Sequence, residues 1–162
     1  GGGWGEGVGR GGVGGGREDD IGNRGEDRAG RRGDAGAKVA GDAAGAVTGA
    51  DAWVLSGTAA TGQDIALARG LGVDPQLFLD TIAGGGNDSP YAQVKGQTMI
   101  AGEFPPAFSL AGAAKDAGLI VDALREAGDD PSLMQAVHRL MLTAAAAGHA
   151  DEDMAAVVYA FR

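Results

Sequence analysis

The sequence predicts an all-α domain over residues 52–162, preceded by a low-complexity segment over residues 1–51. Glycine is concentrated at the start of the chain, where 19 of the 32 glycines fall within the first 50 residues. Beyond residue 51, apolar residues recur at spacings of three and four, and glycine and proline separate the resulting segments. We therefore expect six helices and no strand.

The first 51 residues contain few large apolar side chains, so we expect this segment to be disordered. Its glycines match the dinucleotide pattern G-x-G-x-x-G twice, beginning at Gly7 and at Gly9. That pattern binds a nucleotide only where a buried strand precedes it and a helix follows, and neither element can be built here. RNA binding is disfavoured as well, because aromatic residues are scarce and acidic residues offset the arginines.

Charge and composition exclude several classes of partner. The net charge is −9, and residues 51–162, with six basic and fourteen acidic side chains, account for −8 of it. Phosphate backbones and anionic membranes attract clustered Lys and Arg, so we expect neither nucleic acid nor a membrane as the principal partner. The chain has no cysteine for disulfides or thiolate metal sites, and no apolar run approaches the roughly 20 residues that span a bilayer. We expect a cytoplasmic protein.

Three helices are expected before residue 103. The first spans residues 52–71 and ends at Gly72. Asp74-Pro75 begins the second and Ser89-Pro90 the third, because each pair offers a capping side chain followed by a proline suited to the first turn. Their expected packing residues are Trp53, Leu55, Ala59, Ile65, Leu67, Leu77, Phe78, Ile82, Tyr91, Val94, Met99 and Ile100.

Three further helices complete the domain. One spans residues 108–127, one follows Asp130-Pro131, and a short one follows the acidic run 151–153, whose charges suit a helix N-terminus. We predict no metal site, because His138 and His149 lack a carboxylate pair at ligand spacing and the acidic run lacks the spacing of a calcium loop. The expected packing residues are Leu110, Ala114, Ala117, Val121, Leu124, Leu133, Met134, Val137, Leu140, Met141, Ala145, Met154, Val157, Val158 and Phe161.

Three segments, in this order, resemble the C-terminal helical domain of the β-hydroxyacid dehydrogenase family, which includes 3-hydroxyisobutyrate dehydrogenases. They are LARGLGVDPQLFLDTIAGGGNDS (67–89), FSLAGAAKDAGLIVDALREAG (108–128) and AAAAGHADEDMAAVV (144–158). The resemblance implies a multi-helix fold like the C-terminal domain of 6-phosphogluconate dehydrogenase. It also implies NAD or NADP bound by a separate Rossmann domain, a small 3-hydroxy acid as substrate, and a homodimer.

The resemblance further implies where the catalytic lysine and asparagine of the family should lie. The lysine position falls on Val47 and the asparagine position on Asp51, so neither residue type is kept. Valine has no titratable proton and cannot act as a general acid or base. Lys38 has a similar sequence context but lies nine residues too early. It is a candidate catalytic lysine, and a solvated lysine is the alternative.

Three other positions are implied to contact ligands. Lys115 aligns with the lysine of the family's K-D signature, which implies a cofactor contact, although a lysine extending from a packed helix would have the same spacing. Ser89 and Phe108 match positions near the substrate cleft. A helix cap is the alternative for Ser89, and core packing is the alternative for Phe108.

The sequence thus predicts the C-terminal part of an NAD(P)-dependent oxidoreductase for a small 3-hydroxy acid, a fragment without its Rossmann domain. We expect this chain alone to be inactive, because the pyrophosphate cradle belongs to that other domain. Two alternatives stay open. The replacement of both family residues, at Val47 and Asp51, favours a non-catalytic helical dimerisation module, and an imine reductase-like protein is the other possibility.

Overall fold

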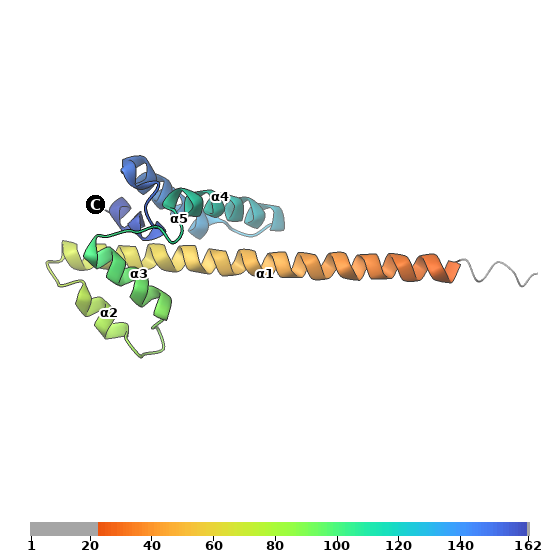
Figure 1. The fold of residues 1–162 in the computed structure, drawn as a ribbon, viewed down its shortest axis with the longest axis horizontal. Helices are drawn as coiled ribbons and strands as arrows, with labels where there is room; N and C mark the ends of the chain where they lie inside the picture. Colours follow the sequence, from red (N-terminus) through yellow and green to blue (C-terminus); the bar gives the residue numbers. More distant parts are fainter. Residues whose placement is uncertain (1–22, 162) are drawn as a thin grey trace, which may run out of the picture. The chain divides into compact units, whose positions relative to one another are not determined.

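The computed structural model describes residues 23–161, with side chains described from residue 41 onward except that of Ala43. This part of the chain forms five α-helices, a π-helical turn and a 3-10 helix, and it contains no strand (Figure 1). The all-α prediction is therefore confirmed. The elements are α1 (Asn23–Gly70), α2 (Gln76–Ile82), α3 (Pro90–Ala101), α4 (Leu110–Ala127), α5 (Ser132–Ala144), η1 (Ala145–His149) and η2 (Met154–Phe161).

The first helix begins earlier than the sequence predicts. The sequence pattern places its start at Ala52, whereas α1 begins at Asn23. The scarcity of apolar side chains excludes a core, yet a helix forms from local hydrogen bonds that need none. Residues 1–22, the rest of the segment for which we expect disorder, lie outside the described residues.

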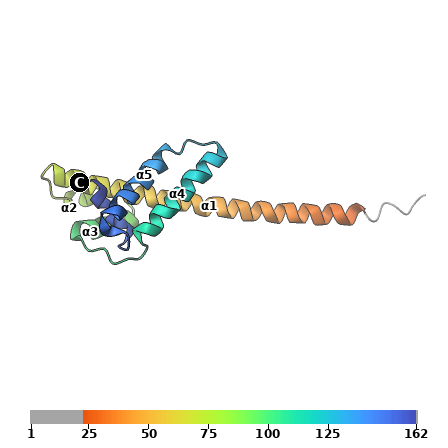
Figure 2. The same cartoon turned by 90° about the horizontal axis from the view of Figure 1, so that it is seen from above.

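The chain divides into two compact units, residues 1–43 and 44–162, and the predicted domain boundary after residue 51 falls within α1. In the second unit, α4 and α5 run side by side as an antiparallel pair (Figures 1 and 2). Their facing sides are buried together with most of η2 and one side of α1. No helix among the described residues combines the length and apolar character needed to cross a membrane.

The apolar face predicted for α4 is confirmed, since Leu110, Ala114, Ala117 and Val121 are buried there. The set of buried side chains predicted for α1 is wrong in part. Leu55, Ala59 and Ile65 are buried, but 74% of Trp53 is exposed. Trp53 precedes Leu55 by two residues and therefore lies on nearly the opposite side of the helix. The other expected core residues that the structure leaves exposed are Leu67, Leu77, Tyr91, Val94 and Leu133.

Side-chain caps fix where the helices begin. The hydroxyl of Ser89 accepts a hydrogen bond from the backbone N–H of Ala92 at 3.0 Å, and Ser109 accepts one from Gly112 at 3.2 Å. Gly102 and Gly128 follow α3 and α4 with positive φ angles of 73° and 82°. This left-handed conformation suits glycine, so the glycine positions in the sequence mark real helix ends.

Gly96 allows α3 to pack closely on α2. A Cβ atom at this position would lie 2.6 Å from Cδ2 of Leu79, a fully buried side chain that would have to shift. We expect Gly96→Ala to lower the free energy of unfolding by about 1–3 kcal/mol through overpacking. Urea denaturation measures this loss.

Gly57 is the matched control for Gly96, because it also lies inside a helix but a Cβ atom there would have no neighbouring atom within 4 Å. Gly57→Ala should raise the free energy of unfolding by about 0.5–1 kcal/mol, since alanine favours the helix more than glycine does. Equal effects of the two substitutions would contradict the close approach of α2 and α3.

Candidate functional site

A cavity of about 340 Å³ opens between α1 and the beginning of α4. It is lined by Asp51, Val54, Leu55, Phe108, Asp116 and Met154. An adjoining hollow of about 200 Å³ is lined by Thr48, Asp51, Asp116, Leu119, Ile120 and Ala123. The carboxylates of Asp51 and Asp116 therefore line both spaces, which we call together the α1–α4 cleft.

Of the predicted site residues, Phe108 lies in this cleft. It is 41% exposed, so core packing, the alternative for this residue, does not describe it. Val47 is 62% exposed and lies one turn before Asp51 on α1. Ser89 lines none of the cavities described here and caps α3 instead. Lys38 lies in α1, but its side chain is outside the described residues.

Lys115 lies beside the cleft rather than in it. Its side chain is 76% exposed, and its Nζ atom is 4.0 Å from Oδ1 of Asp116. An exposed ion pair of this length contributes little to stability, so the ammonium group is available to a ligand. These two adjacent residues of α4 line different cavities, since Asp116 lines the cleft and Lys115 lines a neighbouring groove.

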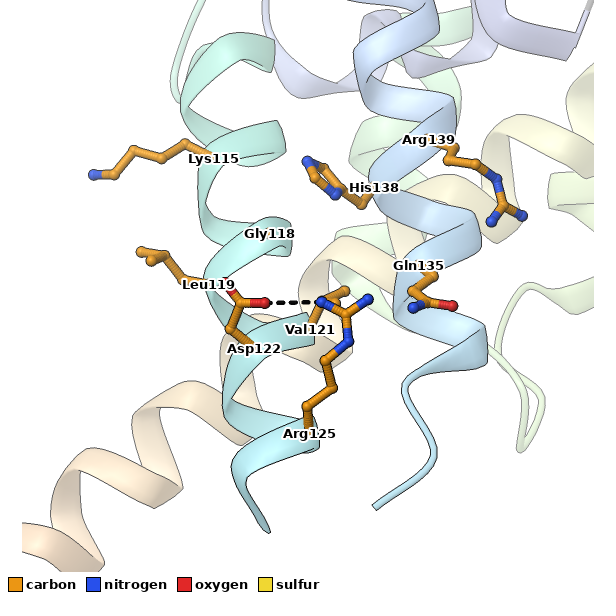
Figure 3. Close-up of a pocket in the computed structure, with 9 residues that line it drawn as sticks. All are labelled: Lys115, Gly118, Leu119, Val121, Asp122, Arg125, Gln135, His138 and Arg139. Carbon is orange, nitrogen blue, oxygen red and sulfur yellow. Dashed lines mark hydrogen bonds and ion pairs between the residues drawn. The ribbon is translucent and has the colours of Figure 1, made fainter. Parts of the chain in front are cut away.

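That groove runs between α4 and α5 and has a volume of about 540 Å³ (Figure 3). We call it the α4–α5 groove. The sequence predicts no role for its basic residues Arg125 and Arg139, and of His138 it predicts only that it does not bind a metal. They come from two helices, and their clustering depends on how those helices align. The lining residues are Lys115, Gly118, Leu119, Val121, Asp122, Arg125, Gln135, His138 and Arg139.

A buried ion pair holds the segment that carries Phe108. Nζ of Lys95 lies 2.6 Å from Oδ1 of Asp153, and their side chains are 9% and 3% exposed. The carboxylate of Asp153 also accepts hydrogen bonds from the backbone N–H groups of Ala107 and Phe108, at 3.2 and 3.4 Å, and from that of Ala155 at 3.0 Å. Asp153 therefore fastens the beginning of α4 to η2. The sequence indicated its helix-capping role but not its pairing with Lys95.

Burial raises the pKa of Asp153, but hydrogen bonds from Lys95 and from the backbone, together with the charge of Lys95, outweigh it and hold the pKa below its ordinary value of 3.8. On acidification, the unfolded chain therefore takes up the proton first. The stabilisation from this carboxylate is complete above the ordinary value and is lost as the pH falls through the lower, folded value.

We therefore expect the free energy of unfolding to fall as the pH decreases from about 5 to about 2. Urea denaturation at a series of pH values measures the fall. The double variant Lys95→Met, Asp153→Leu carries neither charge and should lose less stability over the same range. An identical pH dependence in both proteins would show that Asp153 does not contribute.

The described residues do not form a complete site for a nucleotide cofactor. Residues 23–161 contain no strand, so they hold no strand–turn–helix unit that could cradle a pyrophosphate. The cations of the α4–α5 groove, Lys115 among them, suit an anionic part of such a molecule. The same residues hold no group of three or more His, Asp or Glu side chains that could bind a metal ion.

The fold is that of a helical part of solved dehydrogenases. The structure resembles 3-hydroxyisobutyrate dehydrogenase from Salmonella typhimurium, with a TM-score of 0.66 and 21% identity over 70% of this chain and 40% of that one. It also resembles the Mycobacterium tuberculosis 3-hydroxyisobutyrate dehydrogenase solved with L-serine, with a TM-score of 0.64 and 26% identity over 73% of this chain and 43% of that one.

Residues 50–161 match the family described as NAD-binding of NADP-dependent 3-hydroxyisobutyrate dehydrogenase. The chain belongs to this family of 3-hydroxyisobutyrate dehydrogenase-like β-hydroxyacid dehydrogenases, which confirms the resemblance seen in the sequence.

Two curated relatives align with about two thirds of the chain. It is 30% identical to L-threonate dehydrogenase of Cupriavidus necator over 103 residues, 64% of this chain and 35% of that protein. It is 28% identical to glyoxylate/succinic semialdehyde reductase 2, chloroplastic, of Arabidopsis thaliana over 104 residues, 64% of this chain and 29% of that protein. The chain thus spans about a third of the length of these relatives.

Proposed function

We propose that this chain is the substrate-side helical part of an NAD(P)-dependent oxidoreductase that acts on a small 3-hydroxy acid. The observation that carries the proposal is the α1–α4 cleft. It brings Asp51, at the position of the family's asparagine, next to Phe108 and Asp116 from the second resembling segment. Phe108 and Asp116 are 57 and 65 positions beyond Asp51 in the sequence and line the same cavity.

The size and lining of the cleft fit a small polar substrate. A volume of about 340 Å³ is at the lower end of the range for ligand pockets, about 300–1,000 Å³. Val54, Leu55 and Met154 form apolar walls, and the sulfur of Met154 accepts a hydrogen bond from the hydroxyl of Tyr91 at 3.6 Å. A substrate of a few carbon atoms would be enclosed there with its hydroxyl facing the carboxylates.

A bound dinucleotide would supply the hydride acceptor. The chain's own contribution is to orient the substrate, with Phe108 packing on its carbon skeleton and Asp51 accepting a hydrogen bond from its hydroxyl. Lys115 would contact the cofactor from the neighbouring groove. Val47 cannot take up the hydroxyl proton, so we expect slow turnover even in the presence of a dinucleotide-binding domain.

A second candidate function, a non-catalytic dimerisation module, is favoured by Val47 and by an apolar surface. A groove of about 370 Å³ between α1 and α2 is lined mainly by apolar side chains, of which Leu67, Leu71 and Leu77 are 56%, 69% and 55% exposed. Exposed apolar surface of this kind favours association. We propose a homodimer under either function.

The two functions are separated by supplying the dinucleotide-binding domain of the Cupriavidus necator relative in trans. If the chain is part of an oxidoreductase, the mixture should reduce NAD or NADP in the presence of 3-hydroxyisobutyrate, whereas neither part alone should do so. Phe108→Ala should lower that activity, and Leu133→Ala, at a residue 71% exposed outside the cleft, should not. A dimer without any turnover would favour the dimerisation module. Micromolar binding of NADH by the chain alone would contradict the conclusion that its cofactor site is incomplete.

A further inference from the structure

The place of the Phe108 ring in the α1–α4 cleft depends on a glycine four residues further along the chain. A Cβ atom on Gly112 would lie 3.3 Å from both Cε2 and Cζ of Phe108. The outer end of the ring therefore lies directly on the backbone of α4, at a place that a side chain at position 112 would fill. Phe108 is also 41% exposed and lines the cavity, so the rest of its ring borders open space.

Hydrogen bonds hold the backbone of Phe108 from both sides of its Cα atom. Its N–H donates to Oδ2 of Asp153 at 3.4 Å, and its carbonyl accepts a hydrogen bond from the N–H of Met154 at 2.9 Å. The next residue, Ser109, caps α4 and forms an isolated β-bridge with Asp153. A new atom that pressed on the ring would therefore turn the ring about its own side-chain bonds rather than move the backbone.

Gly112 also lies on the side of α4 that borders the cleft. Asp116, which lines the cleft, follows Gly112 by four residues, and residues four apart lie on the same face of a helix. Leu119, Ile120 and Ala123 continue this side of α4 along the adjoining hollow. The row of α4 residues that borders the cleft thus begins with a position that has no side chain.

We propose that Gly112 is a positioning residue: it leaves room on α4 for the ring of Phe108 and thereby sets the size of the substrate that the α1–α4 cleft accepts. The inference rests on the proposed function, because it takes this cleft as the substrate site. With a methyl group at position 112, the ring would leave its place on α4 and turn into the space between α1 and α4. The cavity holds about 340 Å³, so a small loss of space would exclude the larger of two similar substrates.

The test is a titration of the full nitrogen-15-labelled chain, followed by NMR, with two probes that differ by one methyl branch, 3-hydroxypropionate and 3-hydroxyisobutyrate. Both should shift the amide signals of Phe108 and Asp116 in a saturable manner. Gly112→Ala should weaken the binding of 3-hydroxyisobutyrate about tenfold, the lower end of what one methyl group contributes in an apolar pocket. The binding of 3-hydroxypropionate should weaken by less than about twofold, because this smaller molecule needs less space.

Gly118→Ala is the matched control. Gly118 is also half-buried in α4, and a Cβ atom there would also lie 3.3 Å from a ring atom, Cε1 of His138, but both residues line the α4–α5 groove instead of the cleft. This variant should leave the affinity for both probes within about twofold. In a Phe108→Ala chain, Gly112→Ala should no longer distinguish the two probes, because the ring through which it acts is absent. Urea denaturation verifies that each variant folds.

The proposal is overturned if Gly112→Ala leaves the ratio of the two affinities unchanged, if Gly118→Ala changes that ratio as much, or if the effect of Gly112→Ala persists in the Phe108→Ala chain. It is overturned as well if neither probe gives saturable shifts. A changed ratio in a chain that gives no turnover in trans would support the role of Gly112 while contradicting the proposed oxidoreductase. Turnover in trans, with KM values for the two probes whose ratio is the same with and without Gly112→Ala, would do the reverse.

Discussion

Asp153→Ala should lower the free energy of unfolding by about 3–5 kcal/mol, the cost of leaving a buried charge without its partner. Lys95 is 7% exposed, and its Nζ atom forms an ion pair with Asp153 at 2.6 Å. The substitution also removes the acceptor for the backbone N–H groups of Ala107, Phe108 and Ala155. Four donors, of which Lys95 and the N–H of Ala155 are buried, would lose their hydrogen bonds at once, so the loss should exceed that of an ordinary surface substitution.

Urea denaturation measures this loss, with Asp129→Ala as the control. Asp129 is exposed, and its substitution should change the free energy of unfolding by no more than about 0.5 kcal/mol. The double variant Lys95→Met, Asp153→Leu should be more stable than Asp153→Ala, because it leaves no unpaired charge in the interior. A loss of less than about 1 kcal/mol in Asp153→Ala would mean that water reaches Lys95 and replaces its partner.

The sequence predicts helices correctly where apolar residues and capping residues agree. In α4, one face is fixed by four buried residues at spacings of three and four, from Leu110 to Val121, and the helix begins at a serine and ends at a glycine. In α1, by contrast, the buried side is made largely of small residues such as Ala59 and Gly62, where η2 packs against the backbone. Small residues contribute little to the apolar periodicity of a sequence. The large apolar side chain of Trp53 therefore dominates the pattern in this segment and wrongly indicates a core position.

Residues of the candidate site could be predicted only where they lie in segments that resemble the family. Phe108 lies in one of the resembling segments and is a predicted site residue. The Lys95–Asp153 pair joins residues 58 positions apart, and no local pattern relates them. Arg125, Arg139 and Lys115 line one groove only because α4 and α5 pack side by side, with His138 against Gly118. Such alignment is set by tertiary packing, which spacing along one helix does not encode.

Val47→Lys should raise the turnover of the chain, supplied with a dinucleotide-binding domain, by about 10²–10⁴-fold, the usual contribution of a general acid or base. Val47 is 62% exposed, so a lysine fits there without disturbing the core. It lies one turn before Asp51, and residues four apart on a helix face the same side. The new amine would therefore reach the α1–α4 cleft, where Asp51 can hold it near the substrate hydroxyl.

Two variants test whether proton transfer is the reason for the gain, with steady-state NADH formation as the measurement. Val47→Arg places a cation at the same position but cannot give up its proton, so it should recover little of the activity. Ala46→Lys adds the same amine one residue earlier on exposed α1, where it is rotated by about 100° away from the cleft. A gain that is equal in all three variants would reflect only added positive charge, and it would contradict the assignment of the family's lysine position to Val47. A gain confined to Val47→Lys that increases with pH would mean that a neutral amine takes the hydroxyl proton. Valine at position 47 cannot carry out this step.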